Sequence, residues 1–383
     1  MSLRERMRGI ESDAGMRNRF RNYGVLTNPF PAAGQPVGHP RREDEVDDLV
    51  ADRVRQFEAT GRPSQVVTVE GTQGVGKTNL LNYYEEQFRD YYQEDEAFYI
   101  IRYYPDPEPT FDSLLRKVFQ NLDESHFADI GRKLAQSDVG ARNRAKEIAR
   151  GYEVRIVLNS LEQAGADEEL IMERARLALE WFVGLRVLNR HREELGVSFR
   201  LDTVESRTQA LHDVVYVSEE LGLLKGILLL LDELEKQDYS HSKTRVLRFL
   251  SAIRALIDAL PRCLFLMLAM TPQARLRYFA MLPALAGRLQ DRIELTSLGS
   301  LAEAQDLGSF YLQNAREAAR SHPQMTDGEP GAMPFPPADR ASVLFKELLR
   351  QSEERGTEGV TQRDYLHRLH EEWERTVESG RTA

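Results

Sequence analysis

The sequence has very little cysteine, no long apolar run and no apolar leader. Its single cysteine, Cys263, cannot form a disulfide within the chain, and it begins an apolar run, so we expect a buried thiol in a reducing compartment. No apolar stretch approaches the roughly 20 residues that span a bilayer. The N-terminal stretch MSLRERMRGIESD lacks the apolar core of a signal peptide. These absences predict a cytoplasmic protein with no membrane partner.

Metal-ligating clusters are also missing from the sequence. The histidines are scattered, and only His367 and His370 share a helix face, with no cysteine pair to complete a zinc site. The formal net charge is -10, which argues against a protein coated all over with nucleic acid, although a local basic stripe is compatible with an acidic total. Charge therefore leaves the question of a nucleic-acid partner open.

The 383 residues, of which 41% are hydrophobic, are enough for two domains or for one large domain with an accessory piece. Six arginines and few apolar anchors mark residues 1–22 as a basic arm that is mobile or depends on a partner. A solvated tail and a nucleic-acid contact remain open for this arm. A stretch rich in proline and glycine follows at 22–44, and a helix is predicted at about 43–60.

Short β-branched or aliphatic runs alternate with helical patterns, which predicts an α/β fold with a parallel sheet. The predicted strands are 65–70, 97–104, 227–231, 263–270 and 292–295. Between about 110 and 222 only helical patterns occur, so we expect a large helical insertion, either a recognition or assembly element or an enlarged structural cap. Helical patterns after residue 298 predict a C-terminal helical lid. The expected domains are 1–22, 23–298 with the insertion, and 299–383.

A glycine-rich loop stands between the first predicted strand and a helix. It satisfies G-x-x-x-x-G-K-[ST] in the strand-loop-helix context that this phosphate-binding motif requires. Glycines let backbone N–H groups surround phosphate oxygens, the lysine reaches the β- and γ-phosphates, and the threonine hydroxyl ligates Mg²⁺. The predicted ATP-binding residues are Gly71, Thr72, Gln73, Gly74, Val75, Gly76, Lys77, Thr78 and Asn79, with Thr78 also a metal ligand.

Hydrolysis needs a second anchor for the metal and a base for the attacking water. The aliphatic run 226–231 ends in Asp232 and Glu233. Asp232 is predicted to hold the Mg²⁺ shell through water, and Glu233 to polarise the nucleophilic water. The sequence therefore predicts an enzyme that converts ATP and water into ADP and phosphate, with ATP and Mg²⁺ bound at one site.

Adjacent acids after an aliphatic strand resemble the AAA+ class of P-loop ATPases, and three further features match that class in order along the chain. The next strand ends at Thr271, where the class places a polar sensor of the γ-phosphate. Arg288 and Arg292 lie in a segment that resembles the one carrying an arginine finger, and a helical lid follows. The resemblance implies catalytic roles for Lys77, Glu233, Thr271, Arg288 and Arg292. Surface pairing of the two arginines with acids such as Asp291 and Glu294 is the alternative.

Within that class the lead-in Asn28-Pro29-Phe30 and the charged helix near Arg42 resemble the initiator-like branch, which includes origin-recognition and transposition-regulator ATPases. The tract GLLKGILLLLDELE, with the later AMTP and PALAGRLQDR, resembles the ATP-binding proteins of BREX-type phage-defence islands. The chain departs from the origin-recognition proteins in one respect. We expect its C-terminal part to be too short for both a lid and a winged-helix DNA-binding domain, which argues against direct origin recognition.

The resemblance implies a homo-oligomer in which ATP is hydrolysed between subunits and the ATP state is coupled to DNA or to a DNA-associated protein machine. Two alternatives stay open on the sequence. One is a nucleotide-dependent switch with little turnover that recruits a protein partner. The other is a protein-remodelling ATPase that involves no DNA, because a fold does not specify a client.

Overall fold

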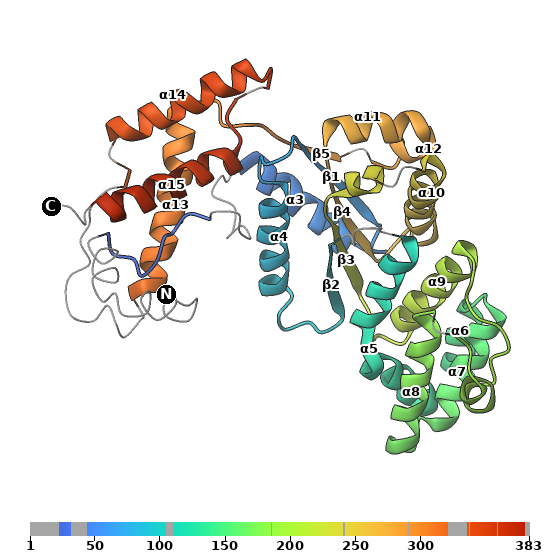
Figure 1. Ribbon diagram of the computed structural model, residues 1–383. Helices are drawn as coiled ribbons and strands as arrows, with labels where there is room; N and C mark the ends of the chain where they lie inside the picture. Colours follow the sequence, from blue (N-terminus) through green and yellow to red (C-terminus); the bar gives the residue numbers. More distant parts are fainter. Residues whose placement is uncertain are drawn as a thin grey trace, which may run out of the picture. The chain divides into compact units, whose positions relative to one another are not determined.

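The computed structural model describes residues 23–31, 44–104, 110–184, 186–239, 242–289, 291–320, 335–336, 338–357 and 359–379 (Figure 1). The basic arm 1–22 lies outside these residues, so the prediction about it is untested. The chain divides into two compact units. The smaller unit comprises Met1–Glu43, Gly71–Tyr83 and Glu294–Ala383, and the larger unit comprises Asp44–Glu70 and Tyr84–Ile293.

A five-stranded sheet is built in the order β2-β3-β4-β1-β5. Its strands are β1 Gln65–Gly71, β2 Phe98–Tyr103, β3 Gly226–Leu231, β4 Leu264–Met270 and β5 Asp291–Leu295. The β1–β4, β3–β4 and β2–β3 pairs are parallel. Every residue of β3 and β4 is buried, as expected of central strands covered on both faces. The predicted α/β fold with a parallel sheet is confirmed.

One helix precedes β1, and others connect the strands. They are α3 Asp44–Glu58, α4 Lys77–Tyr91, α10 Lys243–Ala259, α11 Pro272–Met281 and α12 Pro283–Ala286, with a 3-10 helix at Leu234–Tyr239. Because parallel strands end at a common edge, the residues that follow β3 and β4 leave the sheet on the same side. Asp232 and Thr271 are these residues. Within the described segments, no helix is long and apolar enough to cross a membrane.

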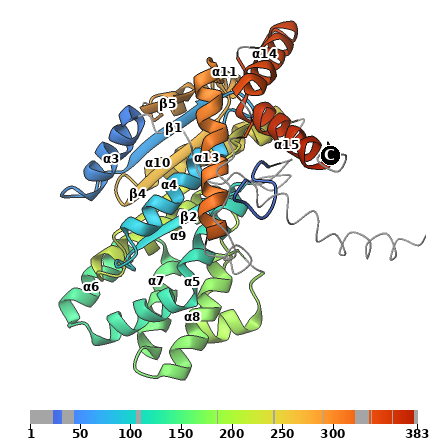
Figure 2. The same ribbon diagram turned by 90° about the vertical axis from the view of Figure 1, so that its left-hand side faces the viewer.

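The insertion consists of α5 Phe111–Gln136, α6 Val139–Ile148, α7 Tyr152–Ala164, α8 Glu168–Phe182, a π-helical turn at His191–Leu195 and α9 Val204–Glu220. The described part of 110–222 contains no strand. Threonine or aspartate caps begin α5, α6, α8 and α9, as at Thr110, whose hydroxyl accepts from Ser113 N. Stacked rings of Phe119, Phe127 and Phe182 join α5 to α8, and α5, α7 and α8 lie together in both views (Figure 1, Figure 2).

A buried histidine fastens the insertion to the sheet. His126 of α5 is hydrogen-bonded through Nδ1 to the Tyr99 hydroxyl at 2.7 Å and through Nε2 to Ser218 Oγ at 2.9 Å. Tyr99 belongs to β2 and Ser218 to α9. Burial lowers the pKa of His126 to about 4, because the charged imidazolium is poorly solvated there.

This low pKa predicts that acid destabilises the larger unit. Since the unfolded chain takes up the His126 proton near pH 6.5 and the folded chain only near pH 4, the stabilisation is present above pH 6.5 and is lost as pH falls toward 4. The loss is up to about 3 kcal/mol in the free energy of unfolding. Urea titrations of the parent and of His126→Gln from pH 7 to 4 measure it. Equal pH slopes in both proteins would contradict the prediction.

The smaller unit has its own apolar core, formed by α13 Leu301–Arg320, α14 Ala338–Glu354, α15 Gln362–Ser379 and the N-terminal segment 23–31. The Phe30 ring packs edge-on against Trp373. Asn28 Nδ2 donates to Glu374 Oε1 at 2.8 Å, and His370 Nδ1 lies 2.7 Å from the Phe30 carbonyl. The Asn28-Pro29-Phe30 lead-in is therefore a structural part of the helical lid.

Candidate functional site

The glycine loop after β1 is closed on itself around a buried lysine. Gly74 and Gly76 adopt left-handed conformations, with φ of 87° and 109°, which favour glycine. Lys77 is buried at the start of α4, and its Nζ donates to the Gly71 carbonyl at 2.8 Å and to the Thr72 carbonyl at 3.1 Å. A Cβ at Gly71 would lie 2.5 Å from Val75 Cγ2, so the turn requires glycine there as well.

These residues fit the phosphates of a nucleotide. The Lys77 ammonium donates to two carbonyls of its own loop. Phosphate oxygens are acceptors too, so those of a bound nucleotide would take the place of these carbonyls. The loop leads into the N-terminus of α4, which carries partial positive charge. Asn79 is buried, and its Oδ1 has no hydrogen-bond partner among the residues that the structure describes. Thr72 and Gln73 are exposed on the loop, and Thr78 is half-buried.

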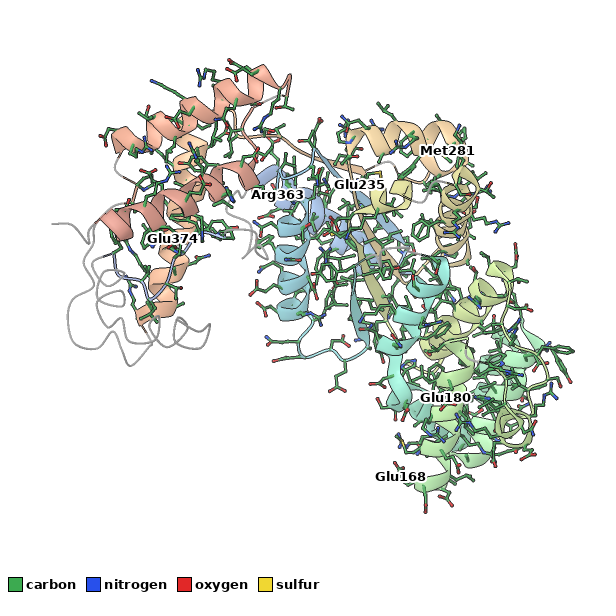
Figure 3. The ribbon with its side chains drawn as sticks, in the orientation of Figure 1. Glu168, Glu180, Glu235, Met281, Arg363 and Glu374 are labelled. Carbon is green, nitrogen blue, oxygen red and sulfur yellow. The ribbon has the colours of Figure 1, made fainter. Side chains whose placement is uncertain are left out.

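The first turn of α15 lies against the same loop. Arg363 N donates to the Gly74 carbonyl at 3.1 Å. A Cβ at Gly76 would lie 2.6 Å from Oε1 of the buried Gln362, so the Gln362 amide occupies the space beside that glycine. Arg363 is labelled at the start of α15 (Figure 3). These two lid residues could not be predicted from the sequence, because no local pattern connects position 362 with position 76.

The carboxylate predicted to anchor Mg²⁺ is already in a buried ion pair. Asp232 is 1% exposed, and its Oδ2 accepts from Arg102 Nη2 at 2.7 Å. Its Oδ1 accepts from Glu233 N at 2.8 Å. Arg102 belongs to β2 and is itself buried, and its Nε and Nη1 have no hydrogen-bond partner within the described residues. Arg102 was not among the predicted site residues, although it is the one charge in the strand FYIIRY.

Removing one member of this pair leaves a charge without compensation in the core. We therefore expect Arg102→Met to lower the free energy of unfolding by roughly 3–5 kcal/mol. The double substitution Arg102→Met with Asp232→Asn is expected to recover much of that loss, because no charge is left buried. Urea unfolding of the two single variants and the double variant measures the coupling. Purely additive losses would show that the ion pair does not act as a unit.

Glu233 has a strained backbone and a partner of its own. Its φ is 44°, an uncommon value for a residue other than glycine and one that recurs at functional sites. Its Oε2 lies 2.6 Å from Lys236 Nζ, and the side chain is 41% exposed.

The Thr271 hydroxyl accepts from Ala274 N at 3.2 Å and caps α11. The cap is the local role that a threonine before Pro272 is expected to play.

The two candidate finger arginines form ion pairs within the chain. Arg288 Nε lies 2.5 Å from Asp258 Oδ1 in a partly exposed pair. Arg292 Nε lies 3.0 Å from Glu70 Oε2, and the Glu70 carboxylate is 1% exposed. Arg275 Nε meets the other oxygen of Glu70 at 2.7 Å. Asp291 is bound instead to Arg53. Asp258 and Glu70 are therefore partners of these two arginines.

The donors available for a metal suit Mg²⁺ better than a transition metal. In the part of the chain that the structure describes, no three His, Cys, Asp or Glu residues form a metal-binding group. Mg²⁺ does not need such a cage, because it is bound through one or two carboxylates, water and substrate phosphates. The sequence predicts Thr78 and Asp232 as its ligands, and that assignment stays a prediction; a bound ion would supply charge neutralisation at the phosphates.

Comparisons with known proteins give only a distant structural likeness. No family model and no curated protein matches the sequence. Two solved structures of the ORC2 protein of Aeropyrum pernix are similar over 90% of this chain. The ADPNP–ADP complexes have 13% identity, cover 71% of the ORC2 chain and give a TM-score of 0.42. The ADP form has 14% identity, 72% coverage and a TM-score of 0.39. A likeness this distant carries no argument, and what the chain's own strands show is an α/β fold with a parallel sheet.

Proposed function

We propose that this chain is a Mg²⁺-dependent ATPase of AAA+ type, which binds ATP on the loop 71–78. The observation that carries the proposal is the buried Lys77 ammonium held by its own loop in a turn that only glycines fit. An ammonium at the start of a helix, where the first backbone N–H groups of the helix are also free to donate, attracts the triphosphate of a nucleotide. The contact of Gln362 and Arg363 with the same loop supports a lid that responds to the bound nucleotide.

Hydrolysis is assigned to the residues after β3. Glu233 is the candidate base that polarises the attacking water, and Asp232 holds the metal shell. Arg102 Nη2 donates to the Asp232 carboxylate and orients it in the buried interior. Asp232→Asn is therefore expected to weaken the magnesium dependence of turnover while nucleotide still binds.

We further propose that subunits assemble and that the ATP state is coupled to DNA or to a DNA-associated protein machine. The support is the resemblance of the motifs to the initiator-like branch and the position of Arg288 outside the apolar core. Head-to-tail contacts of this kind close into rings or extend as filaments. Retention of the chain on DNA at increasing salt, with and without ATP, tests the coupling, because phosphate contacts give a steep salt dependence.

A second candidate is a nucleotide-dependent switch with little turnover. It is favoured by the ion pairs that engage Glu233, Arg288 and Arg292 in the present conformation. A base that is paired with Lys236 is not poised against water. Phosphate release measured over a range of chain concentrations, with Mg²⁺ or with EDTA, separates the two functions. Release that is negligible at every concentration favours the switch, and release that rises steeply with concentration favours the assembled ATPase.

A further inference from the structure

Two aromatic side chains of the helical insertion are far more exposed than rings of their size usually are. Phe199 is 72% exposed and Tyr152 is 70% exposed. Single exposed apolar residues are normal on protein surfaces and need no explanation. Here, however, the backbone that carries each ring is held in place by buried polar groups, so the exposure is maintained by the fold.

The loop that carries Phe199 is fixed on both sides. The Phe199 carbonyl accepts from Nε1 of Trp181, a residue that is 1% exposed, at 2.9 Å. Ser198 N donates to Glu153 Oε2 at 3.0 Å. The flanking Val197 and Leu201 are both buried. With its neighbours anchored inward and its carbonyl bound to Trp181, Phe199 cannot turn into the core without breaking these contacts.

Tyr152 stands on an equally fixed turn. It is the first residue of α7 and follows Gly151, whose N–H donates to Oδ2 of the fully buried Asp213 at 2.7 Å. The residue after Tyr152 is Glu153, which binds Ser198, the residue before Phe199. The two exposed aromatic positions therefore lie on neighbouring backbone segments that this hydrogen bond joins.

Three exposed arginines flank the same positions in sequence. Arg150 precedes the Tyr152 turn, Arg155 lies one helical turn further along α7, and Arg200 follows Phe199. Arg200 forms a long ion pair, in which its Nε lies 3.9 Å from Asp202 Oδ2. Arg150 and Arg155 form no ion pair within the described residues. Positive charge on this surface is thus available to an anionic ligand. We name the set Tyr152, Phe199, Arg150, Arg155 and Arg200 the Tyr152–Phe199 surface.

We propose that the Tyr152–Phe199 surface binds single-stranded nucleic acid. Exposed rings on a rigid backbone offer stacking platforms for unpaired bases, and the guanidinium groups of Arg150 and Arg155, which have no carboxylate partner among the described residues, are suited to bind phosphates. A duplex hides its base faces within the stack and would use the arginines alone, so the pair of rings favours a single strand. The inference rests on the proposed function in one respect, since it names the element through which that ATPase contacts nucleic acid.

Fluorescence anisotropy of the full chain with a labelled thymidine oligonucleotide tests the proposal at several salt concentrations. Tyr152→Ser and Phe199→Ser are each expected to weaken binding, by roughly 5- to 150-fold for each base that loses its stacking partner. Arg155→Gln should reduce the slope of log affinity against log salt by about 0.7. Tyr91→Ser is the matched control, because Tyr91 is an exposed tyrosine of α4, 65% exposed, and should leave affinity unchanged.

The proposal is overturned if the parent fails to bind the oligonucleotide at low salt, or if folded Tyr152→Ser and Phe199→Ser variants bind as tightly as the parent. Unchanged oligonucleotide affinity together with loss of a protein partner would likewise reject it and assign the surface to protein docking. Thermal melting of each variant shows that it is folded. The ATPase is read separately by phosphate release, which these variants should retain, so failure of the surface and failure of the ATPase are distinguishable.

Discussion

Glu233→Gln is expected to bind ATP with the parent's affinity and to hydrolyse it roughly 10²–10⁴ times more slowly. The substitution keeps the shape of the side chain and removes the carboxylate that polarises water, a loss of general-base catalysis of that order. Lys77→Ala is expected to fail earlier, at nucleotide binding, because the ammonium contacts phosphates in the ground state. Equilibrium titration with a fluorescent ATP analogue and single-turnover phosphate release measure the two steps separately.

Lys236→Met is the matched control for this pair of variants. It removes the cation that lies 2.6 Å from Glu233 while leaving the carboxylate in place. We expect its turnover to equal or exceed that of the parent, because Glu233 is released from a partly exposed pair whose stabilisation is small. Equal loss of ATP binding in Glu233→Gln and Lys77→Ala would show that the two roles are wrongly assigned.

Local patterns were enough to predict the sheet and the loop. The apolar runs of β3 and β4 lie in strands within one residue of the expected bounds, since a central parallel strand has to be apolar on both faces. The glycine loop was recognisable because its chemistry is contained in eight consecutive residues. The location of the insertion followed from the same logic, as a long region with helical spacing and no strand pattern.

Contacts between distant segments could not be predicted in this way. Arg102 and Asp232 are 130 positions apart and meet because β2 and β3 are neighbours in the sheet. The single arginine of an apolar strand signals a buried partner, but one sequence does not say which acid that partner is. Phe30 enters the lid core more than 300 residues before Trp373, and no periodicity within either segment reports their contact.

The same limit applied to the candidate finger arginines, because the sequence could not distinguish Arg288 from Arg292. Arg292 contacts a carboxylate that is 1% exposed, so moving it toward another subunit leaves Glu70 with Arg275 alone. Breaking such a contact costs roughly 1–3 kcal/mol, between the values for exposed and for buried pairs. Arg288 pairs with Asp258 where both side chains are partly exposed, and that pair costs about 0–1 kcal/mol to break. We therefore propose Arg288 as the residue that completes a neighbouring subunit's site.

Arg288→Ala should then lower turnover by roughly 10³–10⁵ without lowering stability, because an arginine supplied in trans neutralises charge that develops on the γ-phosphate. Arg292→Ala is the contrasting variant, which should lower the free energy of unfolding and reduce turnover far less. Urea unfolding and phosphate release, measured on both proteins, separate these two effects.

Mixing subunits tests the shared site directly. Arg288→Ala subunits keep a complete nucleotide loop, and Lys77→Ala subunits keep Arg288, so a mixture of the two inactive proteins should recover turnover at interfaces where the intact loop faces the intact arginine. Recovery should rise with total protein concentration, because assembly precedes hydrolysis. A mixture of Arg292→Ala and Lys77→Ala subunits should gain much less turnover, because the Arg292→Ala subunits keep Arg288 and are active before mixing. If no mixture recovers turnover and the parent's specific activity is independent of concentration, the arginine does not act in trans, and the self-contained switch becomes the better description of this chain.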